Sequence, residues 1–300
     1  MSNLSPHAPL QVQASLRGKH LVVGGATGFV GKVWLSHLLQ QVPDIGHITL
    51  LVRAKRGQSA AARWQHTLLC SPTFRWLRAQ HGQALFAWMA ERVTVREARL
   101  EAPRLGLDEA SYRQLGDSAD AVLNFAGLTD FEADPRAALQ VNIEVAMALA
   151  KLAQASPARR LLHISTAYVR GNASGHVPES LAVGRDARGA PFDAAAELTW
   201  LRALCARGST RTRRIEGARA RAIEHGWPNI YTYSKALAEH LLAANGTLQL
   251  SIVRPTIVEG AHRFPLPGWN EGVNTSAPLV WLLSSTFCRF PAQPEHRFDV

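Results

Sequence analysis

A tyrosine and a lysine four residues apart, Tyr231 and Lys235, are the side chains of this sequence best placed for proton transfer. On a helix this spacing puts both on one face, one turn apart. An ammonium group near a phenol stabilises the phenolate and lowers the pKa of the phenol, which can then donate or accept a proton at a carbonyl group. Tyr233 is expected on the opposite side of the helix, which makes it the poorer candidate.

A hydroxyl group that could bind the same carbonyl oxygen is offered by Ser165 or Thr166, which follow a strand predicted over 160–164. Hydride from a bound nicotinamide would reach the carbon while Tyr231 protonates the oxygen, which is carbonyl reduction. The spacing Y-x-x-x-K also occurs by chance on amphipathic helices, so its weight here comes from its place after a glycine fingerprint and a Ser/Thr strand end. These residues leave the choice between the two hydroxyls open.

The element that must hold the cofactor is the stretch His20–Gln40, where an apolar strand-type run turns through glycines into a helical pattern. Gly25 allows a sharp turn, Gly28 lets a pyrophosphate approach backbone N–H groups, and Gly31 lets the helix pack closely. The helix N-terminus adds free donors and a partial positive charge. Glycines also mark ordinary turns, but the strand-to-helix context favours a dinucleotide site. The residues expected to contact the cofactor here are Gly25, Thr27, Gly28, Phe29, Val30 and Gly31.

The cofactor preference is predicted from Arg53, which follows a second strand over 47–52, with Lys55 and Arg56 behind it. An acidic residue at this position would bind the ribose 2′-hydroxyl of NAD, whereas an arginine fork suits a 2′-phosphate. We therefore expect NADPH. The alternative is that Arg53 is a solvated loop cation.

The remaining pattern alternates strands with helices, which predicts an α/β fold with a doubly wound parallel sheet of Rossmann type. A polar leader is expected over 1–17, a dinucleotide-binding domain over 18–260 with a helical insertion at 58–91, and part of a small substrate-side lobe over 261–300. Ligands then lie at the carboxyl ends of the strands. Further strands are expected at 92–95, 120–125, 160–164 and 248–253, and helices at 135–155, near 194–206 within a loop-rich 172–229, and at 231–244.

Composition narrows the class of protein further. Three distant cysteines give neither a disulfide framework nor a metal spacing, the start lacks a signal-peptide core, and the apolar run at 278–283 is too short to span a bilayer. A reduced, cytoplasmic protein without a metal site or a transmembrane segment is expected. The net charge of +10 includes seven arginines against one glutamate between Arg202 and Arg221. This run is either a solvated helix face or an anion-binding surface.

The chain resembles the extended short-chain dehydrogenases/reductases, and within them the fatty acyl-CoA reductases of the male-sterility type, over nearly all of 18–300. The glycine turn and Y-x-x-x-K belong to the wider superfamily, while two stretches, WPNIYTYSKALAE and PGWNEGVNTSAPL, resemble the acyl reductases specifically. The resemblance is carried by GGATGFVGKVWL (24–35), HITLLVRAKR (47–56), HISTAYVRG (163–171), WPNIYTYSKALAEHLL (227–242), SIVRPTIVEG (251–260) and FPLPGWNEGVNTSAPL (264–279).

The resemblance implies NADPH-dependent reduction of a long-chain fatty acyl-CoA thioester to an aldehyde, and in many members to the alcohol. It also implies a catalytic set of Thr166, Tyr231 and Lys235, with Lys235 holding the nicotinamide ribose and Pro255 and Thr256 lining the nicotinamide end. Apolar products make peripheral membrane contact plausible, and no specific nucleic-acid partner is expected.

Three departures from the family pattern stand out. Ala98–Arg99 replaces an expected Gly-Asp or Gly-Glu at the adenine, and Gly24 stands where many relatives have Thr. Similar reductases continue past residue 300, so the sequence is expected to be a fragment or a short form. Two other functions remain open: an extended short-chain reductase or epimerase acting on a sugar nucleotide or ketone, and a non-catalytic cofactor-binding or nucleic-acid-associated protein. Chain-length preference, aldehyde or alcohol as product, and oligomeric state are not determined by the sequence.

Overall fold

The computed structural model describes residues 11–55, 57–173, 175–206, 208–271, 281, 282 and 284. Its centre is a six-stranded sheet in the order β3-β2-β1-β4-β5-β6, and every neighbouring pair is parallel. The predicted doubly wound α/β fold is confirmed. The strands are β1 (His20–Gly24), β2 (His47–Val52), β3 (Val93–Glu97), β4 (Ala121–Asn124), β5 (Arg160–Ile164) and β6 (Gln249–Val253).

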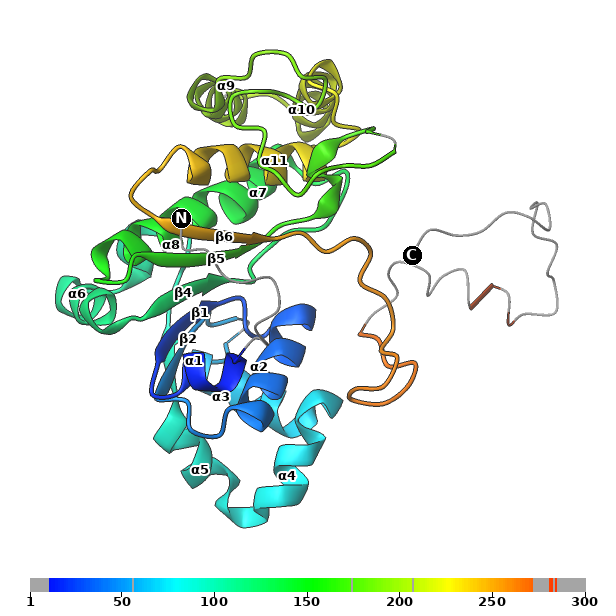
Figure 1. Cartoon of the computed structure of the whole chain (residues 1–300). Helices are drawn as coiled ribbons and strands as arrows, with labels where there is room; N and C mark the ends of the chain where they lie inside the picture. The colour runs from blue at the N-terminus through cyan, green and yellow to red at the C-terminus, as the bar shows by residue number, and fades with distance from the viewer. Residues whose placement is uncertain are drawn as a thin grey trace.

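Helices cover both faces of this sheet (Figure 1). Successive side chains of a strand point to opposite faces of the sheet, so each strand contributes to two hydrophobic cores. In β1, Val22 packs into one core, and Leu21 and Val23 pack into the other. The first core includes α6 (Glu109–Ser118), α8 (Val145–Ala155), α9 (Ala194–Ala206) and α11 (Ile230–Ala243). The second includes α2 (Phe29–Gln41), α3 (Ala60–Cys70), α4 (Arg75–His81) and α5 (Leu85–Arg92).

The last three of these helices, together with two short 3-10 turns, occupy the segment where a helical insertion was expected. A short α1 (Val12–Leu16) precedes the first strand. The third strand is longer and begins later than predicted, because α5 continues to Arg92 before β3 starts.

The helix expected over 135–155 is continuous but irregular. It begins as α7 (Pro135–Ala138), widens into a π-helical segment at Leu139–Glu144, and continues as α8. Single π-helical turns of this kind are often found at functional sites. The buried Asn142 lies in this widened segment.

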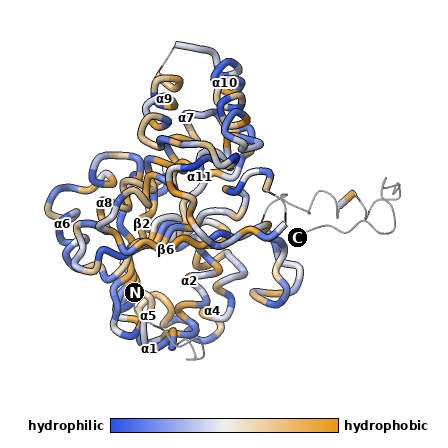
Figure 2. The backbone as a smooth tube through the Cα atoms, turned by 45° about the horizontal axis from the view of Figure 1, so that its top comes forward, coloured by the Kyte–Doolittle hydropathy of each residue, from blue (hydrophilic) through white to orange (hydrophobic). Residues whose placement is uncertain are grey.

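The loop-rich segment expected over 172–229 was only partly predicted correctly. It contains α9, as expected, and also α10 (Arg211–Glu224), which the sequence analysis missed. The two helices lie beyond α11 on the outside of the molecule (Figure 1), and α10 is largely hydrophilic (Figure 2). The arginines that fill α10 obscured the apolar periodicity by which a helix is recognised in sequence.

Three of the arginines in the basic run pair with carboxylates, which neither sequence-based interpretation included. Arg202 contacts Glu144 at 3.3 Å, Arg214 contacts Asp134 at 2.6 Å, and Arg221 pairs with Glu197 on α9. These three cations therefore hold helices together. In the described part of the chain, no helix combines the length and apolar character needed to cross a bilayer.

Candidate active site

The glycine turn after β1 has the geometry that close approach requires. Gly25 adopts a φ of +84°, and a Cβ there would lie 2.4 Å from the backbone nitrogen of Ala126. A Cβ on Gly31 would lie 2.5 Å from the Gly25 carbonyl oxygen, and Gly28 is the N-cap of α2. Gly25 and Gly31 therefore let the backbone pack tightly in this turn, the glycine cradle. The first N–H groups of α2 have no acceptor within the helix and suit a pyrophosphate.

Two residues expected to contact the cofactor, Phe29 and Val30, direct their side chains elsewhere. Phe29 stacks on Trp269 with ring centroids 5.0 Å apart, and both side chains help to line an apolar cavity of about 260 Å³ against the segment after β6. The nearby Lys32, which is buried, pairs with Glu271. At Phe29 and Val30 only the backbone N–H groups are therefore suited to a phosphate.

Arg53 follows β2 directly and is exposed at the carboxyl end of the strand. This is the position expected from the sequence. Ala98, by contrast, is buried and donates its N–H to the Val52 carbonyl at 2.9 Å, while Arg99 is exposed. The exposed guanidinium of Arg53 is thus available to an anion at the edge of the cradle.

Tyr231 and Thr166 meet at the carboxyl edge of the sheet. Thr166 follows β5, and Tyr231 lies in the first turn of α11, which is capped by the Asn229 side chain accepting from the Thr232 N–H at 2.9 Å. The Thr166 hydroxyl lies close enough to the Tyr231 phenol to lower the pKa of that phenol. Thr166 Oγ1 also accepts from the Tyr168 N–H at 3.3 Å.

The pair also bears on the choice between the two candidate hydroxyls. Ser165 is buried, and its Oγ has no hydrogen-bond partner among the described residues. Thr166, by contrast, lowers the pKa of the Tyr231 phenol, which favours Thr166 as the second hydroxyl.

The expected lowering of the Tyr231 pKa is not found. Burial raises the pKa of this phenol, and the hydrogen bond from Thr166 only partly opposes the shift. Lys235 does not offset it, because its Nζ is bound elsewhere: it donates to the Ile164 carbonyl at 2.6 Å and lies 3.3 Å from His163 Nε2. Tyr231 is therefore held as a neutral phenol, the form that can donate a proton.

Tyr233 faces the other side of α11, as expected. It is fully buried and donates to Glu197 Oε2 at 2.8 Å. Burial raises its pKa strongly, and the Glu197 carboxylate adds to the shift. This phenol is bound inside the protein and has no access to a substrate.

The sequence analysis did not identify Asn142. Its side chain accepts from the Leu128 N–H at 2.7 Å, donates to the Leu128 carbonyl at 3.0 Å, and donates to Ser234 Oγ at 2.9 Å. It thereby ties the loop after β4 to α11. A buried asparagine between apolar neighbours was the one available signal.

A second missed group lies beneath Lys235. Asn124 at the end of β4 and His163 in β5 are both fully buried and hydrogen-bonded to each other, and His163 contacts the lysine. Because side chains alternate between the two faces of a strand, the sequence could have predicted that both side chains point into the interior. Their mutual contact depends on the register between β4 and β5, in which Asn124 and His163 are partners.

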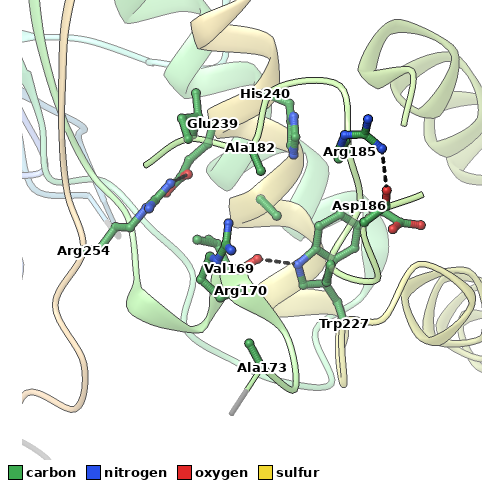
Figure 3. A pocket seen from close by; sticks show the side chains of 14 residues that line it. Val169, Arg170, Ala173, Ala182, Arg185, Asp186, Trp227, Glu239, His240 and Arg254 are labelled. Carbon is green, nitrogen blue, oxygen red and sulfur yellow. Dashed lines mark hydrogen bonds and ion pairs between the residues drawn. The ribbon is translucent and has the colours of Figure 1, made fainter. Parts of the chain in front are cut away.

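A separate cavity of about 230 Å³ lies beside this cluster, between α11 and the loop at 181–189 (Figure 3). It is bordered by the ion pair of Glu239 with Arg254, which lies at 2.6 Å and joins α11 to the end of β6. Trp227 forms another wall and donates its indole N–H to the Val169 carbonyl at 2.7 Å. None of Thr166, Tyr231 and Lys235 lines this cavity.

The parallel sheet, the glycine cradle and the tyrosine–threonine pair define a nicotinamide dinucleotide-binding domain of the extended short-chain reductase type. The family described as "Male sterility protein" matches residues 23–300, and the chain belongs to this family. Similar curated proteins are "Fatty acyl-CoA reductase 1" of Mus musculus (31% identical, over 87% of this chain and 47% of that protein) and "Probable fatty acyl-CoA reductase 5" of Arabidopsis thaliana (30%, over 88% and 56%).

The chain thus spans about half the length of the curated relatives it matches. Among solved structures, the "terminal R domain from the myxalamid PKS-NRPS biosynthetic pathway" superposes with a TM-score of 0.53 at 22% identity, over 84% of this chain and 52% of that chain. At that identity the likeness supports the fold alone.

Proposed function

We propose that this protein reduces a long-chain fatty acyl-CoA thioester with NADPH, giving a fatty aldehyde and, by a second reduction, the fatty alcohol. The observation that carries the proposal is the closeness of the Tyr231 phenol to Thr166 at the carboxyl edge of the sheet, on the same edge as the glycine cradle. Curated relatives that are named fatty acyl-CoA reductases support the choice of substrate.

In this proposal the carbonyl oxygen of the thioester binds the Tyr231 and Thr166 hydroxyls. The nicotinamide, when bound, supplies hydride to the carbonyl carbon. Tyr231 donates its proton to the oxygen as negative charge develops there, and a proton from solvent restores the phenol. As the C–S bond then breaks, the proton on the oxygen is released and the sulfur takes up a proton, so that CoA leaves as the thiol and the aldehyde remains. The same groups serve the second reduction.

The residues of the cradle fit a dinucleotide, because Gly25 and Gly31 allow the tight turn that brings the N-terminus of α2 to the carboxyl end of β1. Arg53 would bind the 2′-phosphate, Lys235 the nicotinamide ribose, and Pro255 and Thr256 the nicotinamide end. The Pro255 carbonyl accepts the Ala167 N–H at 2.9 Å, which keeps it beside Thr166. If Arg53 reads the phosphate, Arg53→Glu lowers the preference for NADPH over NADH by about tenfold or more, because a charge-assisted bond is replaced by repulsion.

The surroundings of Tyr231 suit an apolar acyl group. Phe131 is 58% exposed and lies 5.8 Å from the Tyr231 ring, and Tyr168 is 42% exposed close to Thr166 in the chain. The excess positive charge suits the phosphates of CoA. A cytoplasmic location with peripheral membrane contact is part of the same proposal.

The test is product analysis by mass spectrometry after incubation with NADPH and a mixture of acyl-CoA esters. We expect aldehyde or alcohol, with free CoA and NADP⁺ in matching amounts. Reduced products from ketones or sugar nucleotides alone would replace the acyl-CoA assignment with the alternative reductase. NADPH binding without any product would favour a non-catalytic protein.

A further inference from the structure

Asn124 and His163, which lie beneath Lys235, belong to a linear series of hydrogen bonds. The donor and the acceptor of each bond can be assigned by starting from one end of the series. It runs from the Ala126 backbone through Asn124 and His163 to Lys235. The lengths are 3.0 Å from Ala126 N to Asn124 Oδ1, 3.1 Å from Asn124 Nδ2 to His163 Nδ1, and 3.3 Å from His163 Nε2 to Lys235 Nζ. Both central side chains are fully buried.

The hydrogen bond from Ala126 determines how the side-chain amide of Asn124 is oriented. A backbone N–H can only donate, so the atom of Asn124 that faces it must be the oxygen. The amide NH₂ of Asn124 therefore faces His163 and donates to Nδ1. Since Nδ1 accepts, the hydrogen of the neutral imidazole is on Nε2. The imidazole is neutral because burial holds the pKa of His163 well below its usual value.

The consequence falls on the lysine. The Nε2–H of His163 points at Lys235 Nζ, and an ammonium group has no lone pair to accept it. An uncharged amine accepts this bond and still donates to the Ile164 carbonyl at 2.6 Å. The His163 Nε2–H and Lys235 Nζ avoid a contact between two hydrogen-bond donors only when Lys235 is uncharged.

We propose that His163, held in one tautomer by Asn124, is a positioning residue that stabilises Lys235 as an uncharged amine, so that the lysine gains and loses its charge within the working pH range. The inference depends on the proposed function only for the role of Lys235 in catalysis. Burial lowers the pKa of Lys235 to about 8, opposed by the charge of Glu239.

The other charged groups around α11 leave this assignment intact. Glu239 lies one turn beyond Lys235 and is neutralised by Arg254. On the far side of the helix, Glu197 of α9 faces Tyr233 and pairs with Arg221 of α10. Arg214 of α10 pairs with Asp134, and Glu144 of the π-helical segment pairs with Arg202.

The direct test is long-range ¹H–¹⁵N NMR of the histidine-labelled full chain, with the His163 signals assigned by their loss in His163→Gln. We expect Nε2 to be protonated and Nδ1 to be unprotonated at neutral pH. The Nε2 shift should show a step near pH 8, where Lys235 titrates, and the step should be absent in Lys235→Met. An Nδ1–H tautomer, or a wild-type step that persists in Lys235→Met, would overturn the inference.

Asn124→Asp reverses the polarity of this series of hydrogen bonds with almost no change in shape. The new carboxylate still accepts from the Ala126 N–H, but it now also accepts from His163, which moves the imidazole hydrogen to Nδ1 and frees Nε2 to accept from an ammonium. We expect the tautomer to switch and the step to move up by about one pH unit or more. An unchanged tautomer would contradict the proposal.

These readouts do not require turnover, so they decide the inference even if no acyl-CoA is reduced. If the proposed function holds, the pKa in the pH profile of kcat/KM that belongs to Lys235 moves upward in Asn124→Asp by the same amount as the NMR step. If the NMR step moves in Asn124→Asp but the pH profile of kcat/KM does not, the charge state of Lys235 is not linked to catalysis.

Discussion

Helix α11 carries two tyrosines two residues apart whose surroundings differ completely. Tyr231 is half-buried at the sheet edge, close to Thr166 and beside the exposed Phe131. Tyr233 is fully buried and bonded to Glu197, which Arg221 neutralises. Both phenols have raised pKa values because of burial. The two phenols therefore differ in their exposure and in their bonding partners. Tyr231 can reach a ligand, whereas Tyr233 holds two helices together.

The largest expected effect is that of Tyr231→Phe on turnover. Loss of the proton donor should lower the rate of NADPH oxidation with palmitoyl-CoA by about 1,000-fold, within the usual range for general acid catalysis. The free energy of unfolding should change by less than about 1 kcal/mol, because the buried Thr166 Oγ1 keeps its bond from the Tyr168 N–H. Tyr233→Phe is the matched control. Equal rates in Tyr231→Phe and the wild type would remove this phenol from the mechanism.

The next effect separates the two hydroxyls that follow β5. Thr166→Val removes the hydroxyl next to the Tyr231 phenol and should slow turnover by about 100-fold, as the loss of one donor to a developing oxyanion does. Ser165→Ala should have a much smaller effect on the rate. Steady-state kinetics on both variants decide the matter, and the reverse order would transfer the role to Ser165.

The third effect is on stability. Tyr233→Phe leaves Glu197 with one fewer donor in the interior, so the free energy of unfolding in urea should fall by about 1–2 kcal/mol. Turnover per folded molecule should stay within about twofold of the wild type. A large loss of kcat with unchanged stability would mean that the two faces of α11 do not divide catalysis and helix packing between them.

The smallest effect is the pH dependence of the Glu197 cluster. Burial acts to raise the pKa of Glu197, but bonds from Arg221 and Tyr233 outweigh it and lower the pKa below 4.5. A lowered pKa means that this carboxylate contributes stability above pH 4.5 and loses it as pH falls through the folded-state value. Urea unfolding at stepped pH should therefore show a steeper acid loss in the wild type than in Glu197→Gln. Parallel curves would contradict this.

The same comparison shows what the sequence could predict. The strand–turn–helix pattern and the spacing of Tyr231 and Lys235 are local, so the parallel sheet, the glycine cradle and the inequality of the two tyrosines all followed from local rules. The roles of Asn142 and His163 did not, because each depends on a partner 39 or more residues away in the chain. Helix α10 was missed because its arginines look like solvated residues until their carboxylate partners are known.

The pKa of Tyr231 was mispredicted for a related reason. The spacing of four residues placed Lys235 on the same face of α11 as Tyr231. It could not show that Lys235 Nζ would bond to the Ile164 carbonyl and to His163 instead of approaching the Tyr231 phenol. Spacing along a helix gives the face on which a side chain lies. The hydrogen bonds it makes depend on the neighbouring strand.

The most direct test of the central claim is deuterium transfer from C4-deuterated NADPH to palmitoyl-CoA, followed by mass spectrometry in a single turnover. We predict deuterium on C1 of the aldehyde or alcohol with the wild type and with Tyr233→Phe, and almost none with Tyr231→Phe in the same time. Label arriving at C1 as fast with Tyr231→Phe as with the wild type would contradict the account.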